Sequence, residues 1–260
     1  MKKLFLVLIV LSSCLSLKQN TVSIDNDTYQ YVLEGQGHFT IILESGLGDD
    51  MNTWDPIYNR LTKHARVLAY NRSGYGKSNY KGNKDAQSVA QSLKTLLHQE
   101  NIEGQLILVG HSLGGQYSLA FAKEFQSEIA GVILIDSRHP EFTKECEKYD
   151  AGFCKAPRII YSLWGEHTRE EYNEEATNSN QLVDLSFMER IPLTVISRTK
   201  TKGMESEKFK LLWYQAQRDL ASQSELSKFV EASNSGHYIH KDQPSLVVKE
   251  ILLLIHRLEQ

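Results

Sequence analysis

The chain has 260 residues, a length that suits one large α/β domain or two small ones. Its hydrophobic content of 41% and charged content of 23% are ordinary for a globular protein with a sizeable core, and no repeat or low-complexity segment is visible. The net charge of −3 gives no reason to expect nucleic acid or an acidic polymer as a partner.

The first residues differ in kind from the rest. Lys2 and Lys3 precede an apolar run at 4–11 that is too short to span a bilayer as a helix, a pattern typical of an export signal. The four residues that end at Cys14 resemble the lipobox of bacterial lipoproteins, in which the cysteine carries the lipid. We therefore expect residues 1–20 to be a signal and tether of an exported lipoprotein, anchored through Cys14 to a membrane of the bacterial cell envelope. A plain secretory signal and an uncleaved anchor are the alternatives.

From residue 21 onward, predicted strands alternate with predicted helices. Weak alternation at 21–37 predicts a hairpin of two edge strands, and apolar runs predict further strands at 39–43, 66–70, 106–109 and 129–135. Helical spacing predicts helices at 54–64, 85–99 and 117–125. This order predicts a mostly parallel sheet with helices on both faces, in which chemistry gathers beyond the carboxyl ends of the strands.

The pattern breaks down at about 138–190, where the sequence is charged and helical only in pieces. We interpret this segment as a cap inserted over the strand ends of a single domain that spans 21–260. The core then resumes with a strand at 191–197, a helix at 206–222, a strand at 228–232, a loop at 234–240 and a last helix at 243–257.

Two cysteines, Cys146 and Cys154, lie only eight positions apart within the predicted cap. In an exported protein such an even pair is a candidate disulfide that closes a small loop. Two free thiols are the alternative.

A Gly-x-Ser-x-Gly motif at Gly110–Gly114 stands between a predicted strand and a predicted helix. Strand, tight turn and helix in this order are the context of a nucleophile elbow. Ser112 would then sit on a strained turn with its hydroxyl above the sheet, beside the free N–H groups of the helix N-terminus. By itself the motif is also compatible with a glycine-rich turn that holds an ordinary N-cap serine.

Four motifs in the same order resemble those of the α/β-hydrolase family, and the resemblance extends from about residue 21 to the end. They are Ser45-Gly46-Leu47-Gly48 with Trp54 downstream, Asn71-Arg72-Ser73-Gly74-Tyr75-Gly76-Lys77-Ser78, the Gly110–Gly114 turn, and Ser235-Gly236-His237 before a last helix. The resemblance implies the α/β-hydrolase fold, with a mostly parallel central sheet, helices on both faces and an inserted helical cap. The family often has histidine where this chain has Ser45 and aspartate where it has Asn71. The first departure leaves the backbone role of the loop possible, and the second concerns a structural cap.

The resemblance also implies which residues carry the chemistry. A serine hydroxyl such as that of Ser112 is a poor nucleophile unless a base takes its proton as it attacks. His237 matches the position of the family's base, and His240 is a weaker rival. His111, beside Ser112, is expected to pack against neighbouring loops.

An oxyanion needs donors that are already in place, and the family supplies two backbone N–H groups for it. By position these belong to Leu113, directly after the nucleophile, and to Leu47 in the loop after an earlier strand. Glu44, Asp49 and Asp50 lie near Leu47. We interpret them as a solvated acidic loop, and contact with substrate is the alternative.

The acid that orients the base is Asp136 or Glu205. In most of the family it follows the strand predicted at 191–197, yet no carboxylate appears there until Glu205. Asp136 ends the strand directly after the elbow unit, where a minority of the family places the acid. The order Ser112, Asp136, His237 keeps the sequence Ser…Asp…His. We therefore favour Asp136, which is short and anchored to a buried strand.

Together these residues predict a serine hydrolase that acts on a small-molecule carboxylic ester through an acyl-enzyme on Ser112, with no metal or organic cofactor. Carbon–carbon, thioester or amide hydrolysis by the same three residues is the alternative among enzymes, and a non-catalytic binding protein of this fold is the alternative from another class. Epoxide hydrolases and dehalogenases of this fold place aspartate where Ser112 stands, which counts against them. Neither the substrate nor the oligomeric state can be read from the sequence, because the cap sets specificity and its side chains carry no code.

Overall fold

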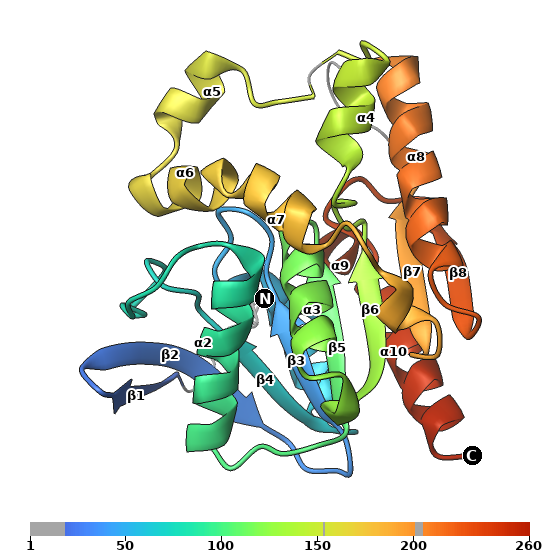
Figure 1. Cartoon of the computed structure of the whole chain (residues 1–260). Coiled ribbons are helices and arrows are strands. Elements are labelled where there is room, and N and C mark those ends of the chain that lie inside the picture. The colour runs from blue at the N-terminus through green and yellow to red at the C-terminus, as the bar shows by residue number, and fades with distance from the viewer. Residues whose placement is uncertain (1–18, 153, 201–204) are drawn as a thin grey trace, which may run out of the picture.

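The computed structural model describes residues 19–152, 154–200 and 205–260, so the predicted export signal and Cys14 lie outside the described residues. The described residues form one eight-stranded sheet with the strand order β1-β2-β4-β3-β5-β6-β7-β8 (Figure 1). The strands are β1 (Asn20–Ile24), β2 (Asp27–Glu34), β3 (Thr40–Glu44), β4 (Arg66–Tyr70), β5 (Leu106–His111), β6 (Ile129–Ile135), β7 (Leu193–Arg198) and β8 (Ser227–Ala232).

The helices cover the two faces of the sheet and build the cap. They are η1 (Met51–Trp54), α1 (Asp55–Leu61), α2 (Ala86–Gln99), α3 (Leu113–Glu124), η2 (Gln126–Glu128), α4 (Phe142–Lys148), α5 (Arg158–Leu163), α6 (Glu166–Asn173), α7 (Glu175–Gln181), η3 (Ser186–Met188), α8 (Glu207–Ser222), α9 (Ile239–Asp242) and α10 (Pro244–Leu258), where η marks a 3-10 helix. Within the described part of the chain, none of these helices has both the length and the apolar character that crossing a membrane requires.

The sheet is mostly parallel, as the alternation of strands and helices predicts. The pairs β3–β4, β3–β5, β5–β6, β6–β7 and β7–β8 are parallel, and β2 runs antiparallel to both β1 and β4. The hairpin predicted at 21–37 is therefore present, but β2 has a partner on each side. Of its two strands, β1 alone lies at the edge of the sheet.

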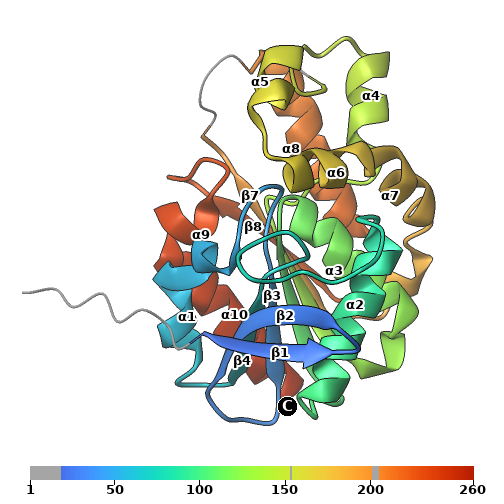
Figure 2. The ribbon, with the colours of Figure 1, turned by 90° about the vertical axis from the view of Figure 1, so that its left-hand side faces the viewer.

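Strand β5 is buried on both faces, which explains why its sequence is a continuous apolar run. Leu106 and Leu108 belong to the buried cluster that contains side chains of α2, α3 and α8, whereas Ile107 and Val109 belong to the cluster that contains α1 and α10. Successive strand residues point to opposite faces, so a strand covered on both sides needs apolar residues throughout. Figure 2 shows α1 and α10 on one side of the sheet and α2 and α3 on the other.

Between β6 and β7 the chain leaves the sheet and forms α4 to α7, which lie over one end of it (Figures 1 and 2). This interval corresponds to the segment interpreted as a cap. Helix α4 packs on α8 through Phe142 and Trp213, and a disulfide joins Cys146 of α4 to Cys154. The bond ties the end of α4 to the loop that leads into α5.

Two segments differ from their predictions. The helix predicted at 54–64 is preceded by the 3-10 turn η1, whose start is capped by the Asp50 side chain accepting from the Asn52 N–H, and it ends at Leu61. Helix α9 begins inside the loop predicted at 234–240. Ile239 is completely buried there, and a four-residue helix is too short to show periodicity in the sequence.

Candidate active site

Ser112 occupies the sharp turn between β5 and α3. Its φ of 53° and ψ of −120° lie in a region that residues with a side chain rarely adopt. A Cβ added at Gly110 would lie 2.6 Å from the Gly114 carbonyl oxygen, and one at Gly114 would lie 2.2 Å from the Glu44 carbonyl oxygen. Both glycines are therefore needed where the helix crosses the strand ends, and the strained turn has the form that the motif predicts.

Two hydrogen bonds connect Ser112, His237 and Asp136. The Nε2 atom of His237 lies 2.9 Å from Ser112 Oγ, and its Nδ1 lies 2.6 Å from Asp136 Oδ2. An ionised carboxylate can only accept, so Nδ1–H donates to Asp136 and the Nε2 lone pair faces the serine hydroxyl. The fold thus brings together side chains that are 101 and 125 positions apart in the sequence.

Asp136 is completely buried at the end of β6, with donors on both carboxylate oxygens. Its Oδ1 accepts from the Trp213 indole N–H at 2.9 Å and from the Arg198 backbone N–H at 3.2 Å. The Arg198 Nε lies 3.3 Å from Oδ2, the oxygen that also accepts from His237. A buried carboxylate is costly unless it is paired and hydrogen-bonded, and these donors supply that compensation.

The alternative acid, Glu205, and the alternative base, His240, both lie away from the hydrogen bonds that join Ser112, His237 and Asp136. Glu205 pairs with the Arg198 guanidinium at 2.8 Å. His240 packs against the Trp54 ring with its Nε2 atom 3.1 Å from Thr53 Oγ1, and burial lowers its pKa to about 3. In the structure, then, the carboxylate on His237 is Asp136, and His240 lies against η1.

His111 packs against the loop that carries His237, which agrees with its expected position. The imidazole is buried, and its Nε2 donates to the His237 carbonyl oxygen at 2.9 Å. Burial, together with the neighbouring His237 and His240, lowers the pKa of His111 well below its usual value. This histidine is therefore a neutral support for the loop.

Leu113 and Leu47, the predicted oxyanion donors, both line the same cavity as Ser112. Leu113 is the first residue of α3, and the first N–H groups of a helix have no acceptor within it. Leu47 follows β3 in the Ser45–Gly48 loop. The structure places both residues beside the serine, and their role as donors remains a prediction.

The interpretation of Glu44 as part of a solvated acidic loop is wrong. Glu44 is buried, accepts from the Tyr70 hydroxyl, and pairs with the Arg72 guanidinium at 2.8 Å. Burial raises the pKa of the Glu44 carboxyl, and Arg72 opposes this shift. The same guanidinium holds Glu171 of α6 at 2.6 Å.

Arg72 and Glu171 could not be predicted from the sequence as members of the site. Arg72 lies inside the Asn71–Ser78 motif, so the motif indicates that its position matters but does not indicate which residues it contacts. Glu171 is one of many acidic residues in the cap, and nothing in the sequence distinguishes it from the others.

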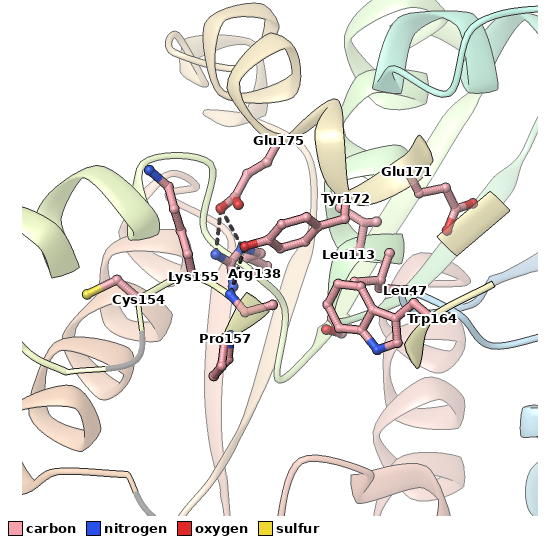
Figure 3. A pocket seen from close by; sticks show the side chains of 12 residues that line it. Leu47, Leu113, Arg138, Cys154, Lys155, Pro157, Trp164, Glu171, Tyr172 and Glu175 are labelled. Carbon is pink, nitrogen blue, oxygen red and sulfur yellow. Dashed lines mark hydrogen bonds and ion pairs between the residues drawn. The ribbon is translucent and has the colours of Figure 1, made fainter. Parts of the chain in front are cut away.

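A cavity of about 220 Å³ lies between Ser112 and the cap. Figure 3 shows Leu47, Leu113 and Trp164 on one side of it and the ion pair of Arg138 with Glu175 on the other. A more open hollow of about 620 Å³ lies on the His237 side of Ser112 and is lined by Trp213 and Tyr238, among others. Ser112 therefore stands at the junction of a narrow chamber and a wider opening.

This arrangement can carry out nucleophilic acyl transfer. It holds a strained serine, a histidine whose lone pair faces the hydroxyl, and a buried acid that fixes the tautomer of that histidine. The strand order, the helices on both faces and the turn at Ser112 are those of an α/β-hydrolase fold.

The comparisons with known proteins agree with this class. The α/β-hydrolase family profile matches residues 40–162. The uncharacterized protein YqjL of Bacillus subtilis is 27% identical over 223 residues, which are 82% of this chain and 82% of that protein. Several other curated relatives are matched over only 28% to 42% of their own length.

Solved structures share the fold across nearly the whole chain. A putative alpha/beta hydrolase of Nostoc sp PCC 7120, ALR0039, superposes with a TM-score of 0.74 at 14% identity and covers 92% of this chain and 98% of its own. A thermophilic esterase from Thermogutta terrifontis gives a TM-score of 0.64 at 16% identity, with 94% of this chain and 100% of its own covered. The chain therefore has the α/β-hydrolase fold, and its residues 40–162 are similar to the α/β-hydrolase family.

Proposed function

We propose that this chain is a serine hydrolase that cleaves a carboxylic ester through an acyl-enzyme on Ser112. One observation carries the proposal: the unbroken hydrogen-bond chain from Ser112 through His237 to the buried Asp136, beside a cavity under the cap. Structural neighbours of the same fold include a protein described as an esterase, and the family profile covers the Ser112 turn.

The proposed reaction begins when His237 Nε2 takes the proton of Ser112 as Oγ attacks the ester carbonyl carbon. Asp136 stabilises the imidazolium, and the N–H groups of Leu113 and Leu47 donate to the oxyanion. The imidazolium then gives its proton to the leaving alkoxide oxygen as the C–O bond breaks. Water repeats both steps, releases the carboxylic acid and restores Ser112.

The shape of the site favours a short acyl chain. The cavity of about 220 Å³ lies below the range of about 300–1,000 Å³ that is usual for ligand sites, and apolar side chains such as Leu113, Pro157 and Trp164 contribute to its walls. The wider hollow on the His237 side offers room for the leaving group, which must receive its proton from that histidine. Short-chain esters are therefore the expected first substrates.

The test uses the full chain, a fluorophosphonate probe and p-nitrophenyl and thioester acyl series. We expect covalent labelling of the wild type at Ser112 and faster turnover of short-chain esters. Ser112→Ala is expected to lose the label and roughly 10⁶-fold of kcat, because a triad loses most of its rate when its nucleophile is removed. Circular dichroism spectra of the two proteins should superimpose.

Other outcomes separate the alternatives. If the wild type takes no label and turns over no ester, the chain is a binding protein on this fold. If labelling occurs but thioesters or amides react faster than esters of the same acyl group, the mechanism stands and the substrate class changes. Hydrolysis at the parent rate by Ser112→Ala contradicts the whole proposal.

A further inference from the structure

Arg72 is a buried guanidinium whose three nitrogens are all engaged. Its Nη1 donates to the Ser45 carbonyl oxygen at 2.7 Å and to Glu44 Oε1 at 2.8 Å. Its Nη2 donates to the Gly46 carbonyl oxygen at 2.8 Å and to Glu171 Oε2 at 3.0 Å, and its Nε donates to Glu171 Oε1 at 2.6 Å. The Arg72 side chain, which follows β4, therefore hydrogen-bonds both to the loop after β3 and to helix α6 of the cap.

The bond to the Gly46 carbonyl has a consequence for the next residue. The Gly46 carbonyl and the Leu47 N–H belong to the same peptide unit, which is planar and trans. Fixing the direction of the C=O bond therefore fixes the N–H bond, which points the opposite way. Leu47 lines the cavity at Ser112, so the Gly46 carbonyl is the group through which Arg72 can orient this N–H.

The same guanidinium also contacts the cap. Glu171 lies on α6, its side chain is completely buried, and it meets the guanidinium with both carboxylate oxygens. The Tyr75 hydroxyl donates to the same carboxylate at 2.9 Å, and the Tyr75 and Tyr117 rings lie 5.5 and 4.8 Å from the Arg72 guanidinium carbon. A forked, planar cation satisfies this geometry, and the point charge of a lysine cannot reproduce it.

We infer that Arg72 is a positioning residue that orients the Leu47 N–H towards the oxyanion, and that Glu171 makes this orientation depend on a docked cap. The inference rests on the proposed hydrolase function, because it concerns a donor used only during acyl transfer. Arg72 does not touch the substrate in this scheme and acts through the Gly46 peptide unit. Cap closure and the oxyanion site are thereby linked through one guanidinium.

The test compares Arg72→Lys and Glu171→Gln with a matched control, Glu170→Gln. Glu170 is an exposed carboxylate on the same helix that pairs with His167 at 3.0 Å. Four quantities are measured: kcat and KM for a short-chain ester, the inhibition constant of a trifluoromethyl ketone, and that of the product carboxylic acid. The ketone forms an oxyanion on the serine, whereas the product acid does not.

For Arg72→Lys we expect a fall in kcat of about 10²-fold, with KM within about threefold, since losing one oxyanion donor costs about 10²–10³ in turnover. The affinity for the trifluoromethyl ketone should fall by a similar factor while the affinity for the product acid changes little. Glu171→Gln should show the same pattern at about tenfold, because it removes the charge but keeps one acceptor. Glu170→Gln should match the wild type within about twofold.

The inference is overturned if both test variants keep the wild-type kcat and ketone affinity, or if ketone and product acid weaken equally, as a general loss of structure would produce. Should Arg72→Lys fail to fold, Glu171→Gln decides alone by the same criteria. Failure of the proposed function looks different: the wild type then neither takes the fluorophosphonate label nor hydrolyses ester.

Discussion

Asp136 is the residue whose assignment depends most on its surroundings. Four contacts from three residues meet its carboxylate: His237 Nδ1, the Trp213 indole N–H, and the backbone and side chain of Arg198. An acid in this role must accept the imidazole N–H and stabilise the imidazolium that forms. The indole and the backbone N–H hold the carboxylate in the orientation that this requires.

The first prediction compares the two candidate acids. Asp136→Asn should lower kcat by about 10⁴-fold with little change in folding, because an amide favours the wrong tautomer of the histidine. Glu205→Gln should stay within a few-fold of the wild type, since Glu205 contacts Arg198 in the structure. Ester hydrolysis by the two variants, with thermal unfolding as the control for folding, distinguishes them. The reverse ranking would assign the role to Glu205.

The sequence could indicate Ser112, His237 and Asp136 because each follows a predicted strand, and strand ends of a parallel sheet meet at one edge. Arg72 could not be assigned in the same way. Its partners Glu44 and Glu171 are 28 and 99 positions away, and hydrogen bonds to backbone carbonyls leave no trace in residue identity. Contacts of this kind are visible only once the chain is folded.

At the scale of elements, the strands were predictable and the short helices were not. The ranges predicted at 66–70 and 129–135 coincide with β4 and β6, because a strand buried on both faces is a continuous apolar run. The sequence of the cap has no comparable apolar pattern from which its helices could be predicted. Helix α5 has no buried residue, and α6 and α7 have one each, so no amphipathic stripe marks their bounds.

Asn71 stands where the α/β-hydrolase family often has aspartate, and its contacts show how a different residue can fill the same structural position. The Asn71 Oδ1 atom accepts from the Met51 N–H at 2.7 Å, at the first residue of η1, and its Nδ2 donates to Gln30 Oε1 at 2.8 Å. An aspartate could accept the first bond but could not donate the second. Asparagine therefore fits this site because Gln30 of β2 presents an acceptor, a detail that the sequence motif alone does not convey.

At the scale of the whole molecule, we propose that the chain is exported and anchored by a lipid on Cys14. The basic Lys2 and Lys3, the apolar run at 4–11 and the position of the cysteine support this proposal. In a bacterial host, the full-length chain should partition into membranes and incorporate labelled palmitate. Cys14→Ser should abolish the label and leave the chain released or unprocessed. An unlipidated cytoplasmic product from the wild-type sequence would contradict the proposal.

The last prediction concerns the dependence of stability on pH. His240 is buried against η1 and His111, and burial lowers its pKa to about 3 in the folded protein, against about 6.5 in an unfolded chain. Between these values the unfolded chain binds a proton that the folded protein excludes. The stability contributed by neutral His240 is therefore fully present above about pH 6.5 and is lost as the pH falls below it, by about 1.4 kcal/mol per pH unit.

Other groups titrate in the same range, so the wild-type curve alone does not isolate this effect. The lowered pKa of His111 makes the folded protein less stable as the pH falls, as that of His240 does. The raised pKa of Glu44 has the opposite effect, because burial of this carboxyl makes the folded protein less stable as the pH rises above about 4.5. The comparison is therefore between the wild type and His240→Asn, by urea unfolding between about pH 8 and pH 5. At pH 8 the variant should be less stable, because it loses the contact with Trp54. The gap should narrow by about 2 kcal/mol as the pH falls to 5, since asparagine takes up no proton in either state. A gap that is the same at every pH would show that His240 is protonated equally in the folded and unfolded protein.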